Sequence, residues 1–224
     1  MNILHIETSS RNCSVAVSRN DQLLSLCQEV SENYKQSESL HTFVKWALEG
    51  AKLNLQEIQG VSLGKGPGSY TGLRIGASAA KGFCFGLNIP LVAIDSMDTM
   101  VLPFLGQGYD YIIPLIDARR MEVYTQVYNG TTGEVEKKTE SLILTSDSFQ
   151  EYSKQKVLFL GDGATKSSGL LDFPEDSFIS NVFPSAKYLI QPAYKKFAAG
   201  ENEDIAYFEP FYLKDFHGLK KNEQ

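Results

Sequence analysis

Runs of apolar residues, separated by short polar turns, divide the start of the chain into strands. Residues 2–7 form an apolar run that predicts a buried strand, and residues 14–18 and 22–30 predict two more. Asn20 and Asp21 lie between the last two runs and are typical of a hairpin turn. The chain is therefore expected to open with three antiparallel strands.

The next apolar pattern, over residues 37–52, has the spacing of a helix. Its apolar side chains recur every three or four positions: Leu40, Phe43, Val44, Ala47, Leu48 and Ala51. Ser37 is a favourable N-cap for this helix, and a second helix is predicted over 72–87 with Thr71 as its N-cap. The apolar stripe of the first helix is wider than one sheet edge requires, so part of it is expected to be left for another chain.

The second half of the chain repeats the order of these patterns. Residues 112–117 form an apolar strand that ends in an acid, as the first strand does. Two further strands are predicted over 121–128 and 134–144, and a short helix over 146–153. A last apolar strand, 157–160, then runs into a glycine-containing turn. Both halves thus have the element order βββαβα.

A duplicated βββαβα unit is typical of the actin, Hsp70 and sugar-kinase (ASKHA) superfamily, in which two halves face each other across a nucleotide cleft. We therefore expect an α/β protein of this fold. Residues 1–106 are predicted to form the first half and residues 107–224 the second. Gly106 and Gly108 are typical of a connector between the two halves.

The stretch 64–76 is rich in glycine and contains a proline, residues that determine backbone conformation. It follows an apolar strand at 61–63, and Gly64, Gly66 and Gly68 permit the positive φ angles of a tight phosphate-binding loop. The spacing does not match a P-loop, because no Lys-Ser or Lys-Thr pair follows a second glycine, and it does not match the dinucleotide fingerprint. A glycine-rich turn between a strand and a helix also needs no ligand, so these residues alone leave both interpretations open.

Polar residues at the ends of two predicted strands are candidates for a nucleotide cleft. In the superfamily, the first strand ends in an aspartate followed by hydroxylated residues or glycine, which hold metal and phosphate. Glu7, Thr8 and Ser9 stand at that place without the glycine. Asp117 and Arg119 stand at the second phosphate position, again without a glycine for close backbone approach. We predict a degenerate cleft, whose other members are Gly64, Gly66, Gly68, Gly161 and Gly163.

Other candidate chemistries have less support. Arg119 and Arg120 either pair with phosphate or are solvated ion-pair partners, and the sequence leaves both open. Ser69 lacks the Gly-x-Ser-x-Gly elbow of a serine hydrolase. A His-based metal centre is not expected, because no two of the three histidines lie within one helical turn: His5, His41 and His217. His5 is expected in the core and the other two on the surface.

Composition and charge narrow the class of protein. A net charge of −6 argues against a protein that binds RNA by itself, because phosphate neutralisation dominates that affinity. The three cysteines are widely spaced, which suggests neither a disulfide framework nor a zinc knuckle and fits a reducing cytosol. No apolar run approaches the length of a membrane span. We therefore expect a cytoplasmic protein without a membrane partner.

Several of these motifs together resemble the TsaB (YeaZ) family, the glycoprotease-like, non-catalytic paralogues of TsaD in making threonylcarbamoyladenosine on tRNA. The specific matches are the loop at 64–76 and Asp117-Ala118-Arg119-Arg120-Met121-Glu122-Val123-Tyr124. Weaker matches are Ile6-Glu7-Thr8-Ser9, Ser37-Glu38-Ser39-Leu40, Gly161-Asp162-Gly163-Ala164 and Glu209-Pro210-Phe211-Tyr212-Leu213-Lys214. Glu7 stands where the family usually has aspartate, which weakens the case for a ligand role of this residue.

The resemblance implies a scaffold and activator of TsaD rather than an enzyme. A TsaD-like protein would hold ATP and metal and transfer threonylcarbamoyl to the adenosine beside the anticodon, so this chain would itself require no cofactor. A TsaE-like ATPase would join them, the chain would form a homodimer when alone, and tRNA would be contacted only through the complex. The family pairs the two helices of its first half with those of TsaD. The corresponding interface residues would be Leu40, Phe43, Val44, Ala47, Leu48, Ala77, Ala80 and Phe83.

Other functions remain open. A small-molecule phosphotransferase of the same fold is less well supported because the phosphate-loop glycines are missing, and a glycoprotease-like enzyme lacks a triad. A structural homodimer could use the same helices. An Ala80→Asp change is expected to leave the monomer folded if Ala80 faces outward, and to weaken the complex.

Overall fold

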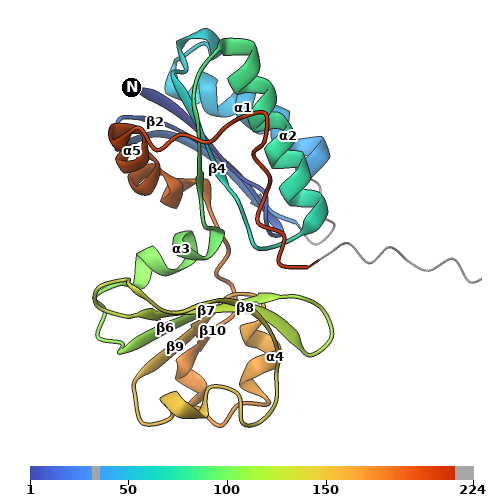
Figure 1. Cartoon of the computed structure of the whole chain (residues 1–224), viewed down its shortest axis with the longest axis vertical. Coiled ribbons are helices and arrows are strands. Elements are labelled where there is room, and N and C mark those ends of the chain that lie inside the picture. Colours follow the sequence, from blue (N-terminus) through green and yellow to red (C-terminus); the bar gives the residue numbers. More distant parts are fainter. Residues whose placement is uncertain (32–35, 215–224) are drawn as a thin grey trace, which may run out of the picture.

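The computed structural model describes residues 1–31 and 36–214 and has two lobes, each built on one five-stranded sheet (Figure 1). The first sheet contains β1 (Asn2–Glu7), β2 (Asn12–Arg19), β3 (Gln22–Val30), β4 (Gly60–Gly64) and β5 (Leu91–Ile94). Their order is β3-β2-β1-β4-β5, in which β1, β2 and β3 are antiparallel and β1, β4 and β5 are parallel. The three predicted antiparallel strands are therefore confirmed.

Two long helices cover one face of the first sheet. The first, α1 (Gln36–Ala51), contacts β2 and β3, and the second, α2 (Tyr70–Leu87), contacts β4. A 3₁₀ turn, η1 (Leu55–Glu57), lies between α1 and β4. The apolar stripes of both helices form one core with alternate residues of the strands, among them Leu4, Ile6, Val15, Val17, Val61 and Leu63. The predicted helices are thus confirmed, and their stripes are buried against their own sheet.

The second sheet repeats the strand order of the first. It contains β6 (Tyr111–Asp117), β7 (Glu122–Asn129), β8 (Val135–Ile143), β9 (Val157–Leu160) and β10 (Phe178–Ile179), in the order β10-β9-β6-β7-β8. In both lobes the first strand is central, the second and third lie antiparallel on one side, and the fourth and fifth lie parallel on the other. This shared topology confirms the predicted internal repeat and the ASKHA-type α/β fold.

Helices are shorter in the second lobe. The helix predicted over 146–153 is only the 3₁₀ turn η3 (Gln150–Tyr152), and α4 (Ala164–Ser168) and η4 (Glu175–Ser177) are also short. The counterpart of α1 is therefore reduced to a single turn. Long helices that can offer an outer surface lie on the first lobe.

The chain crosses between the lobes more than once. A short helix, α3 (Ser96–Val101), and η2 (Leu102–Phe104) lead from the first sheet to the second. After β10, η5 (Ala186–Leu189) and α5 (Ile190–Ala199) return to the first lobe (Figure 1). Side chains of η5 pack with Ala16 and Ile94, on the face of the first sheet opposite α1 and α2.

This return corrects the predicted boundary. Residues 107–224 do not pack as one unit, because η5 and α5 cover the apolar face of the first sheet that α1 and α2 leave open. Glu203 also pairs with Leu91, at the start of β5. Judged by its contacts, the second lobe therefore ends before η5.

One predicted helix cap is also corrected. The N-cap of α2 is Ser69, whose hydroxyl accepts a hydrogen bond from the Gly72 N–H (3.3 Å), and Thr71 lies within the first turn. The N-cap of α3 is Asp95. The predicted cap side chain of Ser37, and His217 with the rest of 215–224, lie outside the described residues.

Candidate functional site

The first-lobe part of the predicted cleft is centred on Glu7, at the C-terminal end of β1. Its side chain is fully buried, and its carboxylate accepts hydrogen bonds from the Ser9 N–H (2.7 Å) and the Ser96 hydroxyl (2.9 Å). Burial raises the pKa of Glu7, and the hydrogen bonds from Ser9 and Ser96 oppose part of that rise. The carboxylate thus joins β1 to α3 inside the protein instead of facing solvent.

Two loop glycines bring the glycine loop into contact with the end of β1. A Cβ atom at Gly64 would lie 1.8 Å from Glu7 Oε2, and a Cβ atom at Gly68 would lie 2.2 Å from the Ser9 carbonyl oxygen. That carbonyl also accepts a hydrogen bond from the Ser69 N–H (2.6 Å). The chain's own atoms therefore occupy the space beside these glycines.

Thr8 makes corresponding contacts with α2. A Cβ atom at Gly72 would lie 2.1 Å from the Thr8 carbonyl oxygen, and one at Gly76 would lie 2.3 Å from Thr8 Oγ1. The Thr8 hydroxyl donates a hydrogen bond to the Gly72 carbonyl (2.8 Å). Of the three predicted loop glycines, Gly66 has a positive φ, +105°, and the other two serve close packing rather than a left-handed backbone.

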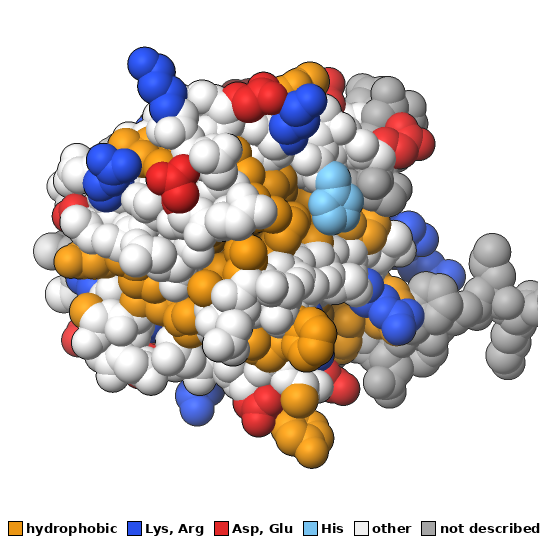
Figure 2. Space-filling model, turned by 90° about the horizontal axis from the view of Figure 1, so that it is seen from above, with side chains coloured by type: hydrophobic (Ala, Val, Ile, Leu, Met, Phe, Trp, Pro, Cys, Tyr) orange, Lys and Arg blue, Asp and Glu red, His pale blue; other side chains and the backbone are white. Residues whose placement is uncertain are grey.

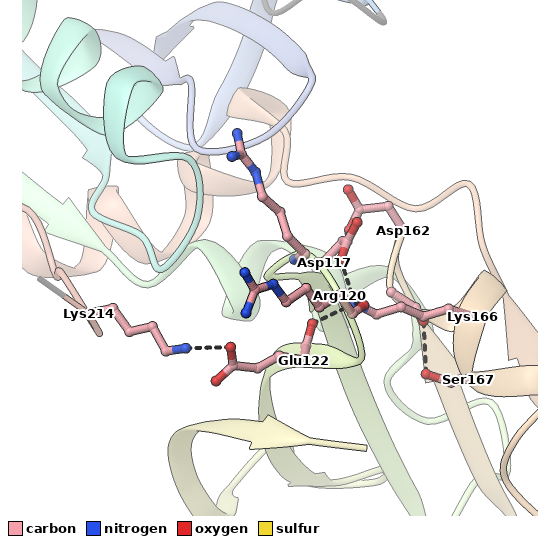
Figure 3. A network of polar contacts seen from close by, with 9 residues as sticks. Asp117, Arg120, Glu122, Asp162, Lys166, Ser167 and Lys214 are labelled. Atoms are coloured by element: carbon pink, nitrogen blue, oxygen red, sulfur yellow. Dashed lines mark hydrogen bonds and ion pairs between the residues drawn. The ribbon is translucent and has the colours of Figure 1, made fainter. Parts of the chain in front are cut away.

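The second-lobe part of the predicted cleft is a polar network at the end of β6 (Figure 3). Asp117 Oδ1 accepts hydrogen bonds from the Arg119 N–H (2.9 Å) and from Lys166 Nζ of α4 (2.5 Å). The Asp117 N–H in turn donates to Asp162 Oδ1 (2.9 Å), and burial raises the pKa of Asp162. The predicted residues Asp117 and Arg119 are therefore brought together, but through the Arg119 backbone.

Gly161 and Gly163 have the same steric role as the first-lobe glycines. Cβ atoms at these positions would lie 2.4 and 2.8 Å from the Leu115 carbonyl oxygen. Gly161 also has a φ of +116°, which favours glycine. Both glycines therefore allow the turn after β9 to pack against β6.

The segment 203–214 runs along the first lobe and ends on the second (Figure 1). The Phe211 N–H donates to the Lys65 carbonyl in the glycine loop (2.7 Å), and Lys214 forms an ion pair with Glu122 at the start of β7. In the sequence, residues 209–214 are recognised only as a weak match to the family. In the structure this segment ties the glycine loop to the second lobe.

The sequence analysis did not indicate Lys166, and it gave Lys214 only as the last residue of a family motif. Their carboxylate partners, Asp117 and Glu122, are 49 and 92 positions away along the chain. No local spacing rule reports such pairs, since they form only when distant segments of the chain come together in the tertiary structure.

The residues predicted to face a partner lie mainly in the core of the first lobe. Seven of the eight are less than a tenth exposed: Leu40, Phe43, Val44, Ala47, Leu48, Ala77 and Ala80. The prediction that these side chains are presented to another chain is therefore wrong. The physical reason is that an amphipathic helix turns its apolar stripe toward its own sheet.

The outer sides of the same helices form a shallow groove. A hollow of about 630 Å³ is lined by His41 of α1 and by Arg74, Ile75, Ser78, Ala79, Gly82 and Phe83 of α2. Trp46 and Phe85 on these helices are 52% and 85% exposed. Viewed from this end of the molecule, hydrophobic side chains gather in a band across the surface (Figure 2). Phe83 is the one predicted interface residue that lines the groove.

His5 is confirmed as a core residue. Its ring nitrogens form hydrogen bonds with Ser62 Oγ (2.6 Å) and Ser18 Oγ (2.8 Å), and burial lowers its pKa to about 3. Within residues 1–31 and 36–214, no group of three or more His, Cys, Asp or Glu side chains is placed to hold a metal ion. No helix in the same residues is long and apolar enough to cross a membrane.

Asp95, between β5 and α3, is expected to make stability depend on pH. Its carboxylate accepts a hydrogen bond from the Met97 N–H (2.9 Å), while burial, followed by repulsion from Asp98, raises its pKa to about 7 from 3.8. Because the folded state holds this proton more tightly, the stability that Asp95 contributes is complete below the unfolded pKa and is lost as pH rises through the folded pKa.

Asp95→Asn keeps an N-cap and removes the ionisation. The free energy of unfolding of the variant minus that of the natural protein should increase by about 1–4 kcal/mol between about pH 4 and pH 7, and then stay constant. Urea unfolding at a series of pH values measures this difference. The titration of His5 changes the free energy of unfolding in the opposite direction, but it does so equally in both proteins and therefore cancels. A difference independent of pH would show that Asp95 ionises equally easily in both states.

The fold defines an ASKHA-class protein in which Glu7, at the first predicted phosphate position, is buried against the protein's own residues. A solved Pseudomonas aeruginosa structure described as similar to the peptidase YeaZ has a TM-score of 0.80 at 24% identity, covering 95% of this chain and 99% of its own. A family model described as TsaD, tRNA N6-adenosine threonylcarbamoyltransferase, matches residues 30–207.

Curated relatives cover the chain almost completely. The Bacillus subtilis tRNA threonylcarbamoyladenosine biosynthesis protein TsaB is 30% identical over 96% of this chain and 94% of its own. The Escherichia coli protein of the same name is 27% identical over 99% of this chain and 98% of its own. The chain belongs to the TsaB family.

Proposed function

We propose that this protein is a non-catalytic subunit in the formation of threonylcarbamoyladenosine on tRNA, and that it binds and activates a TsaD-type transferase. The groove between α1 and α2 carries this proposal. Its lining combines the small residues Ser78, Ala79 and Gly82 with the apolar Ile75 and Phe83 and the polar His41 and Arg74, and exposed aromatic rings lie on the same helices. Small residues allow helices of another chain to approach closely.

The contacts of Glu7 and Asp117 support a non-catalytic role. Glu7 is buried and engaged by two donors, and Asp117 is held by Lys166. The Glu7 carboxylate is therefore not exposed to a ligand, and Asp117 Oδ1 is already neutralised by a lysine. We therefore propose that this chain requires no cofactor, and that ATP and metal are bound by the TsaD-type partner. A TsaE-like ATPase completes the proposed complex, tRNA is bound through it, and the chain pairs with itself when alone.

The two enzyme alternatives have less support from the geometry. A phosphotransferase needs phosphate-accessible backbone N–H groups beside β1, where Ser69 N–H is already bonded to Ser9. A glycoprotease needs a reactive serine, whereas the Ser69 hydroxyl accepts a hydrogen bond as the N-cap of α2.

Ser78→Asp tests the proposed surface. Ser78 is exposed in the groove, so the change should alter the free energy of unfolding by about 0.5 kcal/mol or less. Binding to the TsaD-type partner should weaken at least tenfold, since the carboxylate loses water in a helix–helix contact. Calorimetry of the two purified proteins measures this, together with tRNA modification by the mixture.

Thr131→Asp is the matched control, because Thr131 is exposed in the turn after β7 on the other lobe. It should bind and support modification as the natural protein does. A folded Ser78→Asp variant with natural affinity would overturn the proposed docking surface. Failure of the natural protein to bind any TsaD-type partner would overturn the proposed function itself.

A further inference from the structure

The turn between β6 and β7 has an unusual backbone at two arginines. Arg119 and Arg120 have φ angles of +68° and +51°, in the left-handed region. A residue with a Cβ atom is strained in this region, whereas glycine is not. Glycine or asparagine would adopt this turn more easily, so the retention of two arginines needs an explanation.

Lys166 holds this turn in place. Besides its ion pair with Asp117, its Nζ donates hydrogen bonds to the carbonyl oxygens of Arg120 (2.9 Å) and Glu122 (2.5 Å). The Glu122 N–H also donates to the Arg119 carbonyl (3.2 Å). The backbone that carries the two guanidinium groups is therefore fixed before any ligand arrives.

The two guanidinium groups themselves are exposed and unpaired. Within the described part of the chain, neither Arg119 nor Arg120 has a side-chain hydrogen bond or ion pair, and no dashed line reaches the Arg120 guanidinium in Figure 3. The carboxylates around them are already engaged: Asp117 by Lys166, Glu122 by Lys214 and Asp162 by the Asp117 N–H. Positive charge is therefore available here to an outside anion.

The surroundings favour a phosphodiester over a metal-bound nucleotide. Residues 117–121 contain no glycine that would let backbone N–H groups surround a phosphate. The negative charges of the nearest carboxylates, Asp117 and Glu122, are each balanced by a lysine. Two neighbouring guanidinium groups on an exposed turn instead suit the sequence-independent contact that proteins make with the phosphates of a nucleic-acid backbone.

We propose that the Arg119–Arg120 turn is a phosphate-binding element that contacts the backbone of the RNA handled by the complex. This inference rests on the proposed function. The chain has a net charge of −6, so as a whole it repels RNA. Two guanidinium groups on a fixed backbone turn therefore direct the RNA to one edge of the second lobe.

The test is the variant Arg119→Gly/Arg120→Gly, which removes both charges and suits the left-handed backbone. Its melting temperature should equal or exceed that of the natural protein. In the complex with the TsaD-type partner, affinity for a fluorescent tRNA at about 0.1 M salt should fall about tenfold or more. The slope of log affinity against log salt should decrease by about 1–2.

Two further variants define the contact. Arg119→Lys/Arg120→Lys keeps the charges and should retain part of the affinity. Lys154→Ala removes an exposed cation before β9, at the opposite end of the second sheet, and should change neither affinity nor slope. Unchanged tRNA affinity and slope in the double glycine variant, with the complex intact, would overturn the inference.

Two control titrations separate this inference from the proposed function. If the natural protein forms no complex, the same tRNA is titrated into the isolated chain at low salt, where loss of binding in the glycine variant supports the turn and equal binding overturns it. Mg-ATP is titrated in parallel. ATP binding that depends on the arginines, with tRNA binding unchanged, would assign the turn to a nucleotide and overturn an RNA contact.

Discussion

Ala80→Asp is expected to destabilise the first lobe strongly, not to weaken a complex between folded proteins. Ala80 is fully buried on the inner side of α2, in the cluster that includes Leu4, Val44 and Val61. A carboxylate there has only apolar neighbours, and the burial of an unpaired charge costs several kcal/mol. Since whole domains are stable by only about 5–15 kcal/mol, this change should remove a large part of the free energy of unfolding.

Circular dichroism during urea unfolding measures this effect directly. Ser78→Asp is the matched control, because it introduces the same carboxylate two positions earlier on the same helix but on its exposed side. The control should unfold at nearly the natural urea concentration. Natural stability of Ala80→Asp would show that α2 does not pack on the sheet as described.

The contrast between these two positions explains why the fold was easier to predict than the partner surface. A spacing of three and four residues identifies a helix and its apolar side, and α1 and α2 were predicted nearly at their true bounds. The same spacing does not tell which neighbour covers that side. In this protein the covering neighbour is the chain's own sheet, and the exposed groove consists largely of small or polar residues such as Ser78 and Gly82.

The return of the chain to the first lobe was not predictable for a related reason. The apolar pattern of η5 and α5 shows that these elements pack on something, but Ala16 and Ile94 are far away in sequence. The ion pair of Lys214 with Glu122 is likewise a product of tertiary structure. Local patterns therefore predicted the repeated sheet order, whereas contacts between distant segments determined how the two lobes are joined.

The glycine loop shows both the value and the limit of sequence patterns. Its glycines predicted positive φ angles for a phosphate-binding loop, but only Gly66 has one, and the atoms close to the others belong to Glu7, Thr8 and Ser9 of the same chain. Nothing in the spacing distinguishes a carbonyl group of the protein from a phosphate oxygen. The difference is measurable because an internal contact contributes to stability without any ligand.

Gly72→Ala is accordingly expected to destabilise the protein by about 2–4 kcal/mol, although alanine is the better helix former. The added Cβ would lie 2.1 Å from the Thr8 carbonyl oxygen, which is backbone and cannot turn aside. Gly86→Ala in the same helix is the matched control, because a Cβ there has no atom within 4 Å. This control should stabilise the protein by about 1 kcal/mol.

Gly76→Ala distinguishes a side-chain clash from a backbone clash in the same contact. Its Cβ would lie 2.3 Å from Thr8 Oγ1, so Thr8→Ala, which removes that oxygen, should restore part of the stability lost in Gly76→Ala. The same Thr8→Ala change should not rescue Gly72→Ala, because the Thr8 carbonyl remains. Urea unfolding of the single and double variants gives both coupling energies. Two results would contradict this account: equal rescue of the two glycine variants by Thr8→Ala, or natural stability of Gly72→Ala. Either would show that the turn after β1 can move away from α2, so that Gly72 and Gly76 are not required for packing.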